Sequence, residues 1–333
     1  MKEKRIVLSK TPLRITFTGG GTDIPSYYKE HGPGAVVSAA VSHYIYVASG
    51  INFYPDEIRV AYSKTENALK SIDEIQHPTV REAMRLLTVK SGVQLVSITE
   101  IPSRGTGLGS SSSFLVGVLN TLHTRKGEKI SPRQLAEEAC LIEREILREP
   151  GGRQDQYIAA YGGIKYMEFA KDGKVSLKDI HIDYNDMKDL ERHIMLFYTG
   201  KERSSTKIHV TQAKGTEDHI ESYDRMRDAA KETALAMEKG DMEQIGALLH
   251  ENWELKKTLA NGISNPMIDR WYGAARKHGA LGGKIIGAGG GGFLMVFAPQ
   301  KRHAEIAKAL NGGLRQVPLT FELEGSKIVY VDE

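Results

Sequence analysis

The sequence predicts an α+β protein of two domains, because strand-rich and helix-rich segments occupy different parts of the chain. Its 333 residues, of which 40% are hydrophobic and 26% charged, are enough for one large core or two domains. Short stretches rich in β-branched and aromatic residues fill the first third, and helical spacing of apolar residues dominates the last third. Residues 187–192 form a polar connector. We therefore expect one domain at residues 1–187 and a second at residues 188–333.

Composition excludes several classes of function. The net charge is only +3 and the Lys and Arg residues are scattered, so no nucleic-acid partner is expected. A single cysteine, Cys140, rules out an internal disulfide, and no apolar run approaches the ~20 residues of a membrane span. We therefore predict a cytoplasmic protein without a membrane partner. The histidines form no cluster at metal-ligand spacing, so the composition allows a loosely bound Mg²⁺ but not a tight zinc or iron site. A homodimer is left open.

The first part of the chain is predicted to consist mainly of short strands separated by Gly, Pro and Asn. These strands cover residues 5–9, 14–17, 34–41, 44–50 and 57–62, and two more follow at residues 162–169 and 174–182. A helix should begin after Ser131, because Pro132 suits its first turn and Gln134 completes a capping box. We expect this helix to run to about Glu149, where a proline and two glycines end it.

The second part is predicted to mix strands and long helices. A strand at residues 193–198 precedes helices at residues 218–239, 242–260, 266–278 and 302–310. The strand-glycine-strand segment KIIGAGGGGFLMVF lies at residues 284–297 and matches GxGxxG, but no helix follows it, so we reject a dinucleotide site. Its glycines could press against another loop or a bound phosphate, or could form only a structural turn. These glycines are Gly287, Gly289, Gly290, Gly291 and Gly292.

The segment PSRGTGLGSSSS at residues 102–113 is predicted to bind phosphates. Its alternating glycines can form a concave nest of backbone N–H groups, and the apolar run at residues 114–122 predicts a buried helix directly after it. The serines would then stand at a helix N-terminus, where anions are favoured. The alternative, a flexible Gly/Ser linker, would not normally join a strand to an apolar helix. No Lys follows the last glycine, so this is not a Walker loop.

Glu143 is predicted to point toward the core. At 100° per residue it falls within the apolar arc of its helix, which contains Leu135, Ala136, Ala139, Cys140, Ile142, Ile146 and Leu147. Because an unpartnered buried charge is very costly, Glu143 should be paired, protonated or bound to a cation. A carboxylate at a partly solvated helix edge or in a structural salt bridge fits the helix geometry equally well.

Two glycine-rich segments resist a purely structural explanation. TPLRITFTGGGTD at residues 11–23 places Arg14 in a strand and Asp23 after three glycines. GGRQDQYIAAYGG at residues 151–163 places Asp155 in a glycine-bounded turn. Either aspartate alone would most simply be a helix cap or a turn residue. Together, the two segments indicate loops that build a site.

These segments together resemble the GHMP kinase family, which includes galactokinase, homoserine kinase, mevalonate kinase and phosphomevalonate kinase. The family's motifs occur here in order across residues 12–297. The resemblance implies an N-terminal domain with a left-handed β-α-β unit, a C-terminal α+β domain and an active site in the cleft between them. It also implies an ATP- and Mg²⁺-dependent kinase, because this family transfers a phosphoryl group to small molecules.

The resemblance implies a role for each segment. Asp155 would accept the proton of the substrate hydroxyl beside Arg14, and Ser111 and Glu143 would hold Mg²⁺. The ATP phosphates would be wrapped by Gly105, Thr106, Gly107, Leu108, Gly109, Ser110, Ser111 and Ser112. The acceptor would be bound by Gly20, Gly21, Thr22, Asp23 and Gly152. The loop at residues 287–292 would support the phosphate loop.

The implied acceptor is a sugar phosphate. Within the family, residues 11–23 and 151–163 look most like sugar kinases that act on the anomeric oxygen of D-glycero-D-manno-heptose 7-phosphate. Gly20 and Gly21 stand where galactokinases carry a Glu-His pair, which argues against galactose. The acceptor's own phosphate could be bound by Lys201, Arg203, Ser204 and Ser205, or these residues could form a solvated basic loop. Alternatives are a mevalonate-type or fucose/galactose-type kinase, a decarboxylase of the family, or a sensor that binds ATP and sugar without turnover.

Overall fold

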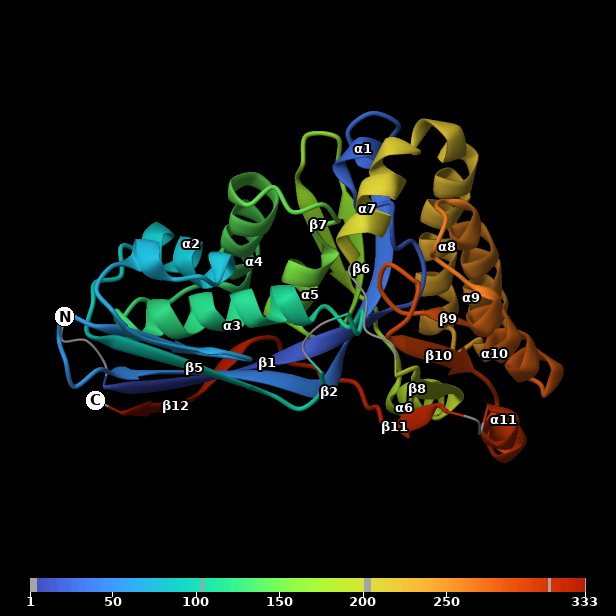
Figure 1. Cartoon of the computed structure of the whole chain (residues 1–333). Coiled ribbons are helices and arrows are strands. Elements are labelled where there is room, and N and C mark those ends of the chain that lie inside the picture. The colour runs from blue at the N-terminus through green and yellow to red at the C-terminus, as the bar shows by residue number, and fades with distance from the viewer. Residues whose placement is uncertain (1–4, 103–104, 201–204, 311–312, 333) are drawn as a thin grey trace.

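Two β-sheets with helices packed on them form the molecule. The computed structural model describes residues 5–102, 105–200, 205–310 and 313–332, and Figure 1 shows the two sheets and their helices side by side. The first sheet has strand order β12-β1-β2-β5-β3-β4, with β6 paired to β2 and β7 paired to β6. The second has order β11-β8-β10-β9. The predicted α+β class is confirmed.

The first sheet is built around one long antiparallel pair, β1 (Ile6–Thr16) and β2 (Gly34–Ile51). The sequence predicts two short strands in place of each, because Pro12 interrupts the pattern of β1. The structure instead carries β1 through a register shift between Pro12 and Leu13, where the missing N–H of proline is tolerated. The other strands are β3 (Ile58–Ala61), β4 (Thr65–Leu69), β5 (Val93–Thr99), β6 (Ile164–Phe169) and β7 (Val175–Asp179).

The last strand, β12 (Lys327–Asp332), belongs to the first sheet. It pairs antiparallel with β1, from Lys10 opposite Lys327 to Ile6 opposite Asp332. The chain therefore returns to the first sheet after completing the second. The proposed division at residue 187 stays a prediction, and the structure adds that residues 327–332 lie in the sheet of the first part.

One face of the first sheet carries helices. They are α2 (Pro78–Leu86), α3 (Ser110–Arg125), α4 (Pro132–Cys140) and α5 (Gln154–Tyr161) (Figure 1). Two short helices complete this part, η1 (Ile72–Glu74) and α1 (Pro25–Tyr28). The central helix α3 packs against both β1 and β2. It also packs against α2, α4 and α5, and these contacts together bury most of α3, so its N-terminus is held at a fixed position beside the end of β1.

The helix that was predicted to run from Ser131 to Glu149 changes its winding. After α4, residues Leu141–Ile146 form the π-helix η2, in which each turn is wider than in an α-helix. Glu143 is buried as predicted, with 1% of its surface exposed. Ile146 was expected in the apolar arc but is 45% exposed, because the wider turns shift the residues that follow. π-Helical turns are frequent at functional sites.

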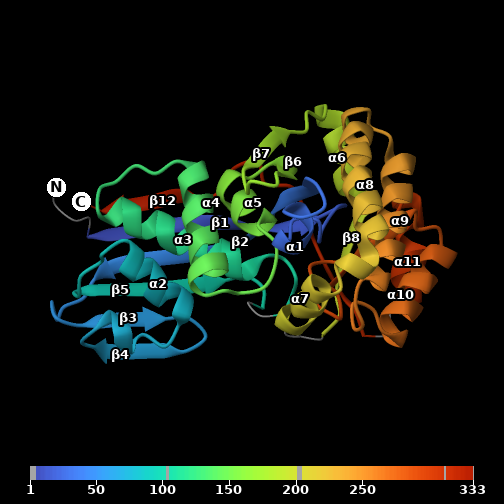
Figure 2. The same ribbon diagram turned by 90° about the horizontal axis from the view of Figure 1, so that it is seen from above.

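The second sheet is formed by β8 (Ile194–Tyr198), β9 (Gly282–Ile285), β10 (Phe293–Phe297) and β11 (Arg315–Val317). Its helices are α8 (Ile220–Glu238), α9 (Met242–Thr258), α10 (Pro266–Lys277) and α11 (His303–Leu310), which Figure 2 shows from above. The short segments are η3 (Glu217–His219) and η4 (Gln300–Arg302). The expected polar connector is instead part of helix α6 (Tyr184–His193), which buries only Leu190 and His193. Helix α7 (Ser205–Lys214) contacts α1.

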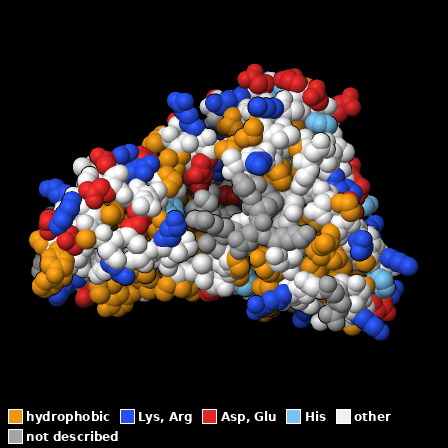
Figure 3. All heavy atoms as spheres, viewed as in Figure 1, with side chains coloured by type: hydrophobic (Ala, Val, Ile, Leu, Met, Phe, Trp, Pro, Cys, Tyr) orange, Lys and Arg blue, Asp and Glu red, His pale blue; other side chains and the backbone are white. Residues whose placement is uncertain are grey.

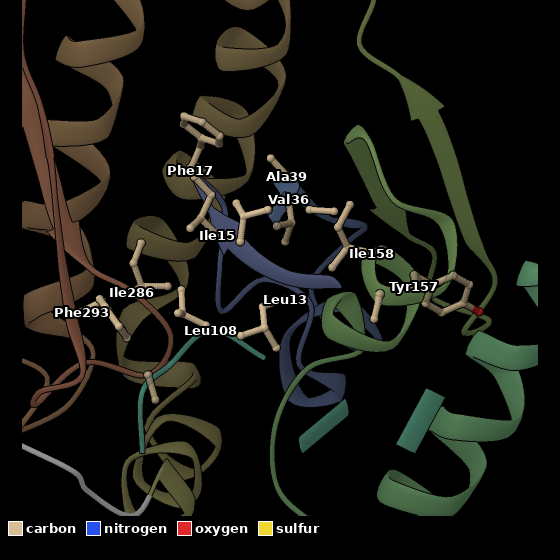
Figure 4. Packing of buried hydrophobic residues seen from close by; sticks show 14 of the residues in the cluster. Leu13, Ile15, Phe17, Val36, Ala39, Leu108, Tyr157, Ile158, Ile286 and Phe293 are labelled. Atoms are coloured by element: carbon tan, nitrogen blue, oxygen red, sulfur yellow. The ribbon is translucent and has the colours of Figure 1, made fainter. Parts of the chain in front are cut away.

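Both parts share one hydrophobic core. Figure 4 shows Leu13 and Ile15 of β1 and Phe17 just after it, together with Phe293 of β10 and Ile286, which directly follows β9. Polar contacts also join the parts, and two of them hold the loop that follows β1. Asn252 Oδ1 accepts the backbone N–H of Gly19 at 2.9 Å, and Lys284 Nζ donates to the carbonyl of Phe17 at 3.0 Å. The loop after β1 is therefore held by side chains from the second part.

Candidate active site

The glycine-serine segment has the backbone shape that the sequence predicts. Gly105, Gly107 and Gly109 have φ values of 67°, 80° and 76°, which favour glycine because they are left-handed. The serines that follow form the first turn of α3, so orphan backbone N–H groups point toward this loop. The side chain of Leu108 is fully buried and anchors the loop in the core (Figure 4).

We call residues 105–112 the phosphate-type loop. A second glycine loop, at residues 287–292, lies directly against it. A Cβ placed on Gly287 would come within 2.6 Å of Gly107 Cα, and one on Gly292 would overlap the carbonyl of Thr106. Gly289 approaches Ile263 just as closely, and the backbone N–H of Gly290 donates to the Ile263 carbonyl at 2.7 Å. The glycines of residues 287–292 therefore permit contact between two backbones, which a simple hairpin turn would not require.

Arg14 and Asp155 form a bidentate ion pair at the end of the same loop. Arg14 Nε donates to Asp155 Oδ1 at 2.8 Å, and Arg14 Nη2 donates to Oδ2 at 2.6 Å. Arg14 Nη1 also donates to the carbonyl of Gly107. Asp155 lies in the first turn of α5 rather than in the predicted glycine-bounded turn. The pair lies between the phosphate-type loop and the neighbouring cleft. The Asp155 side chain is 22% exposed.

Glu143 is buried and fully partnered. It accepts hydrogen bonds from Ser111 Oγ at 3.1 Å, from Ser112 Oγ at 2.8 Å and from Gln156 Nε2. Arg144 Nη2 lies 3.5 Å from Glu143 Oε2. The π-helix thus aims this carboxylate at the N-terminus of α3, where Ser111 itself is exposed. A carboxylate and a hydroxyl oxygen are both ligands suited to Mg²⁺, which is usually held by one or two carboxylates and substrate phosphates.

Asp23 connects the loop after β1 to α5. Its Oδ1 accepts the backbone N–H of Gly21 at 3.1 Å, and its Oδ2 accepts that of Gln154 at 3.2 Å. Gly152 lies against this carboxylate so closely that any Cβ would overlap it. Thr22 is fully buried, and its hydroxyl donates to the carbonyl of Ala35 at 2.8 Å. Thr22 therefore supports the loop from beneath.

A small polar cleft of about 70 Å³ lies beside the Arg14–Asp155 pair. Its lining comes from both parts of the molecule: Arg14, Thr16, Gly20, Gly21, Asp23, Ile24, Arg144, Gly151, Gly152, Gln154, Asp155, His209, Gln212, Lys256, Gly287 and Ala288. Figure 3 shows a hollow near the centre of one face, with acidic side chains inside it. Aspartates, glutamines and cations dominate the polar lining, so this cleft suits a ligand rich in hydroxyl or anionic groups.

Sequence reasoning missed several residues that build this site. Gln154 and Gln156 flank Asp155, and Gln154 Oε1 accepts the Thr16 hydroxyl at 2.7 Å. Lys256 is buried in α9 and donates to the carbonyl of Gly287 at 2.6 Å. The signal for Lys256 was available, because Asn252 and Lys256 are polar residues four apart on the buried face of a helix. Glu143 was identified in the same way, as a polar residue on the apolar face of its helix.

Part of the predicted site lies outside the described residues. Lys201, Arg203 and Ser204 belong to this group, so their proposed role in binding a substrate phosphate stays a prediction. Ser205 begins α7. Over the part of the chain that the structure describes, no helix is long and apolar enough to cross a membrane. Among the same residues, no group of three or more His, Cys, Asp or Glu side chains could hold a metal ion.

Fold and site together define a small-molecule kinase, and comparison with known families supports this class. The model described as GHMP kinases N terminal domain matches residues 74–163, and the model described as GHMP kinases C terminal matches residues 216–314. The two matches occur in the expected order and cover both parts of the structure. The chain therefore belongs to the GHMP kinase family and is a kinase.

Individual relatives are similar over nearly the whole chain. The D-glycero-alpha-D-manno-heptose 7-phosphate kinase of Campylobacter jejuni is 29% identical over 322 residues, which is 92% of this chain and 93% of the relative. A solved D-glycero-D-manno-heptose 1-phosphate kinase from Bacteriodes thetaiotaomicron is 26% identical with a TM-score of 0.81, covering 98% of this chain and 100% of that one. The mevalonate kinase of Thermococcus sibiricus is 27% identical over 277 residues, 79% of this chain and 77% of the relative.

Proposed function

We propose that this protein transfers the γ-phosphate of ATP, with Mg²⁺, to a hydroxyl of a sugar phosphate. The acceptor proposed is the anomeric oxygen of D-glycero-D-manno-heptose 7-phosphate. One observation carries the proposal. The Arg14 guanidinium contacts both the carbonyl of Gly107 in the phosphate-type loop and the carboxylate of Asp155 in the cleft. Donor and acceptor sites therefore meet at this ion pair.

The phosphate-type loop is proposed to hold the ATP phosphates. Its left-handed glycines and the first turn of α3 supply backbone N–H groups, and the exposed hydroxyl of Ser111 lies beside them. When bound, Mg²⁺ would neutralise charge on the β- and γ-phosphates. Ser111 and Glu143 are the residues that would hold it. The hydrogen bond of 3.1 Å between their side chains supports this assignment, because both oxygens face one location.

Phosphoryl transfer would use Asp155 as the proton acceptor. The acceptor hydroxyl oxygen forms a bond to the γ-phosphorus, the bond from phosphorus to the bridging oxygen breaks, and ADP leaves with that electron pair. The hydroxyl proton moves to a carboxylate oxygen of Asp155. Arg14 fixes the orientation of the carboxylate through two hydrogen bonds and adds a positive charge beside the transferring group.

The nature of the cleft supports a sugar acceptor over the alternatives. Asp23, Gln154 and Lys256 line it with polar groups, whereas a mevalonate-type acceptor would be expected to need more apolar contacts. The heptose phosphate kinases named above are similar over at least 92% of this chain. A binding sensor without turnover would not need the Arg14–Asp155 pair.

ADP release in the presence of a panel of acceptors tests the proposal. The panel contains D-glycero-D-manno-heptose 7-phosphate, hexose phosphates, fucose, galactose and mevalonate, each assayed with ATP and Mg²⁺ and again after chelation by EDTA. We expect the fastest release with the heptose phosphate and loss of release on chelation. Faster turnover of mevalonate or of an unphosphorylated sugar would reject the proposed acceptor, and no release with any acceptor would favour the sensor.

A further inference from the structure

Gln154, at the start of α5, has a side-chain amide that is held rigidly at the acceptor cleft. Its Oε1 accepts the Thr16 hydroxyl and the Ser38 hydroxyl, each at 2.7 Å, which occupies both lone pairs of this oxygen. Its backbone N–H donates to Asp23 Oδ2 at 3.2 Å. Thr16 and Ser38 are buried side chains of β1 and β2, so the sheet fixes the orientation of the amide.

The other end of the same amide, Nε2, is left for a ligand. Among the residues that the structure describes, none accepts a hydrogen bond from Nε2. Gln154 lines the cleft, and its Nε2 is not enclosed by the protein. A Cβ placed on Gly20, which lines the same cleft, would lie 3.7 Å from Nε2. Because Gly20 has no side chain, the space beside this donor stays open.

The amide donor lies next to the Arg14–Asp155 pair. Arg14 and Thr16 are two positions apart in β1, so they point to the same face of the sheet, about 7 Å from each other along the strand. Arg14 contacts Asp155, and Thr16 contacts Gln154. The strand therefore presents a proton-accepting carboxylate and an amide donor side by side. An acceptor whose hydroxyl faces Asp155 can place a neighbouring oxygen at Gln154.

We propose that Gln154 Nε2 donates a hydrogen bond to the acceptor oxygen next to the reacting hydroxyl, and so selects sugars. For an anomeric hydroxyl, this oxygen is the ring oxygen or the 2-hydroxyl oxygen. The inference rests on the proposed function and gives a reason for its acceptor class. Mevalonate has a methylene group beside its primary hydroxyl and would leave the donor unpaired. Sites built to hydrogen-bond a substrate oxygen discriminate strongly against analogues that lack it.

The test pairs a variant of Gln154 with analogues of the acceptor. Gln154→Met removes the donor at nearly constant size, and Thr16 and Ser38 can then bond to each other, since their hydroxyl oxygens lie 3.2 Å apart. Gln244→Met, at an exposed position on α9, is the matched control.

The acceptors are heptose 7-phosphate, its 2-deoxy analogue and its carbocyclic analogue, in which a methylene group replaces the ring oxygen. With one analogue, the loss in kcat/KM should be at least about fivefold smaller in Gln154→Met than in the parent. That analogue identifies the oxygen.

A second variant covers the donor and leaves Gln154 itself unchanged. In Gly20→Ala the new methyl group lies beside Nε2, so the loss with the same analogue should shrink as it does in Gln154→Met. Losses that are equal for all three acceptors in Gln154→Met would mean that Gln154 only supports the shape of the site. That result, or kinetics identical to those of the parent, would overturn the inference.

Failure of the proposed function gives a different result. If another sugar is turned over faster than heptose 7-phosphate, the proposed acceptor is wrong, and the analogues of that sugar test the contact. If mevalonate is turned over fastest, the contact is rejected together with the sugar acceptor.

If nothing is turned over, the same comparison is made by melting temperature, with a nonhydrolysable ATP analogue in the nucleotide site. Heptose 7-phosphate should then stabilise the parent more than one analogue does, and Gln154→Met should lose this difference. No shift in the parent, or the same difference in both proteins, would reject the contact.

Discussion

At the residue scale, Arg14 and Asp155 carry most of the chemistry that the site supports. The pair is bidentate, and only 5% of the Arg14 surface is exposed to solvent. The Asp155 carboxylate and the Gly107 carbonyl together orient the arginine, and the arginine in turn orients the carboxylate toward the cleft. Neither residue could be replaced without disturbing the other, so kinetic measurements must be read together with a measurement of folding.

Asp155→Asn should lower kcat by roughly 10²- to 10⁴-fold while nearly preserving the KM for ATP, because the amide cannot accept the hydroxyl proton. Steady-state ADP release measures both parameters, and the melting temperature reports whether the uncompensated Arg14 weakens folding. Asp172→Asn, at an exposed turn, should behave like the parent. Turnover within a few-fold of the parent would remove Asp155 from the proton transfer.

Gly152→Ala should raise the KM for the acceptor, because the new methyl group would overlap the Asp23 carboxylate. Displacing Asp23 also removes its hydrogen bond with the backbone N–H of Gln154, next to Asp155. Gly273→Ala is the matched control, since a Cβ there meets nothing within 4 Å and the residue lies in α10. Acceptor titrations that overlap for Gly152→Ala and the parent would show that this close approach does not shape the acceptor site.

At the element scale, His123 joins the C-terminal end of α3 to α4. Its Nδ1 lies 2.6 Å from Glu128 Oε2 and its Nε2 lies 2.8 Å from Glu138 Oε2, while 6% of the side chain is exposed. Burial opposes the charged imidazole, but the hydrogen bonds with Glu138 and Glu128 raise the pKa of His123 above 6.5. The folded state therefore holds this proton more tightly than the unfolded state does.

Replacing His123 with Gln should lower the free energy of unfolding, and the loss should be larger at low pH than at high pH. The contribution is fully present below pH 6.5 and disappears as the pH rises through the raised folded-state pKa. We expect the variant to be less stable by about 1 kcal/mol at pH 6, with a smaller difference at pH 9. Urea unfolding at both pH values measures this difference, and one that grows with pH would contradict the assignment.

The elements themselves were predictable to different degrees. The three long helices of the second part match α8, α9 and α10 closely, because their apolar residues repeat at helical spacing. Residues 131–149 were predicted as one α-helix, because local spacing carries no information on a change to π-helical winding. Pro12 misled the strand prediction for a similar reason, since a register shift against β2 is a property of the pair of strands.

At the scale of the whole molecule, the two parts meet around the loop that follows β1. Lys284, from β9, is fully buried and reaches across to the carbonyl of Phe17. Burial lowers the pKa of Lys284 well below 10.5, and the positive charges of Lys256 and Arg14 lower it further. The unfolded state therefore binds more protons than the folded state between the lowered pKa and 10.5, so stability rises with pH over that interval.

Lys284→Met removes this pH dependence. We expect the parent protein to gain stability relative to the Met variant as the pH rises from 7 to 10, by at most about 1.4 kcal/mol per pH unit. Denaturant unfolding of both proteins across this pH range measures the difference in their free energies of unfolding. Groups that titrate in both proteins contribute equally and cancel in this difference. A difference that stays constant, or that shifts in favour of the Met variant, would mean that Lys284 folds with its proton retained.

The sequence by itself determined the local features of this protein. It predicted the left-handed glycine loop before an apolar helix, the burial of Glu143 and membership of the GHMP kinase family. Only the tertiary structure decided which distant residues meet. Arg14 contacts Asp155 across 141 positions, Gly287 meets Gly107, and β12 returns to the first sheet. Sequence patterns report local conformation and burial, whereas these meetings depend on how the two sheets pack, which no local pattern encodes.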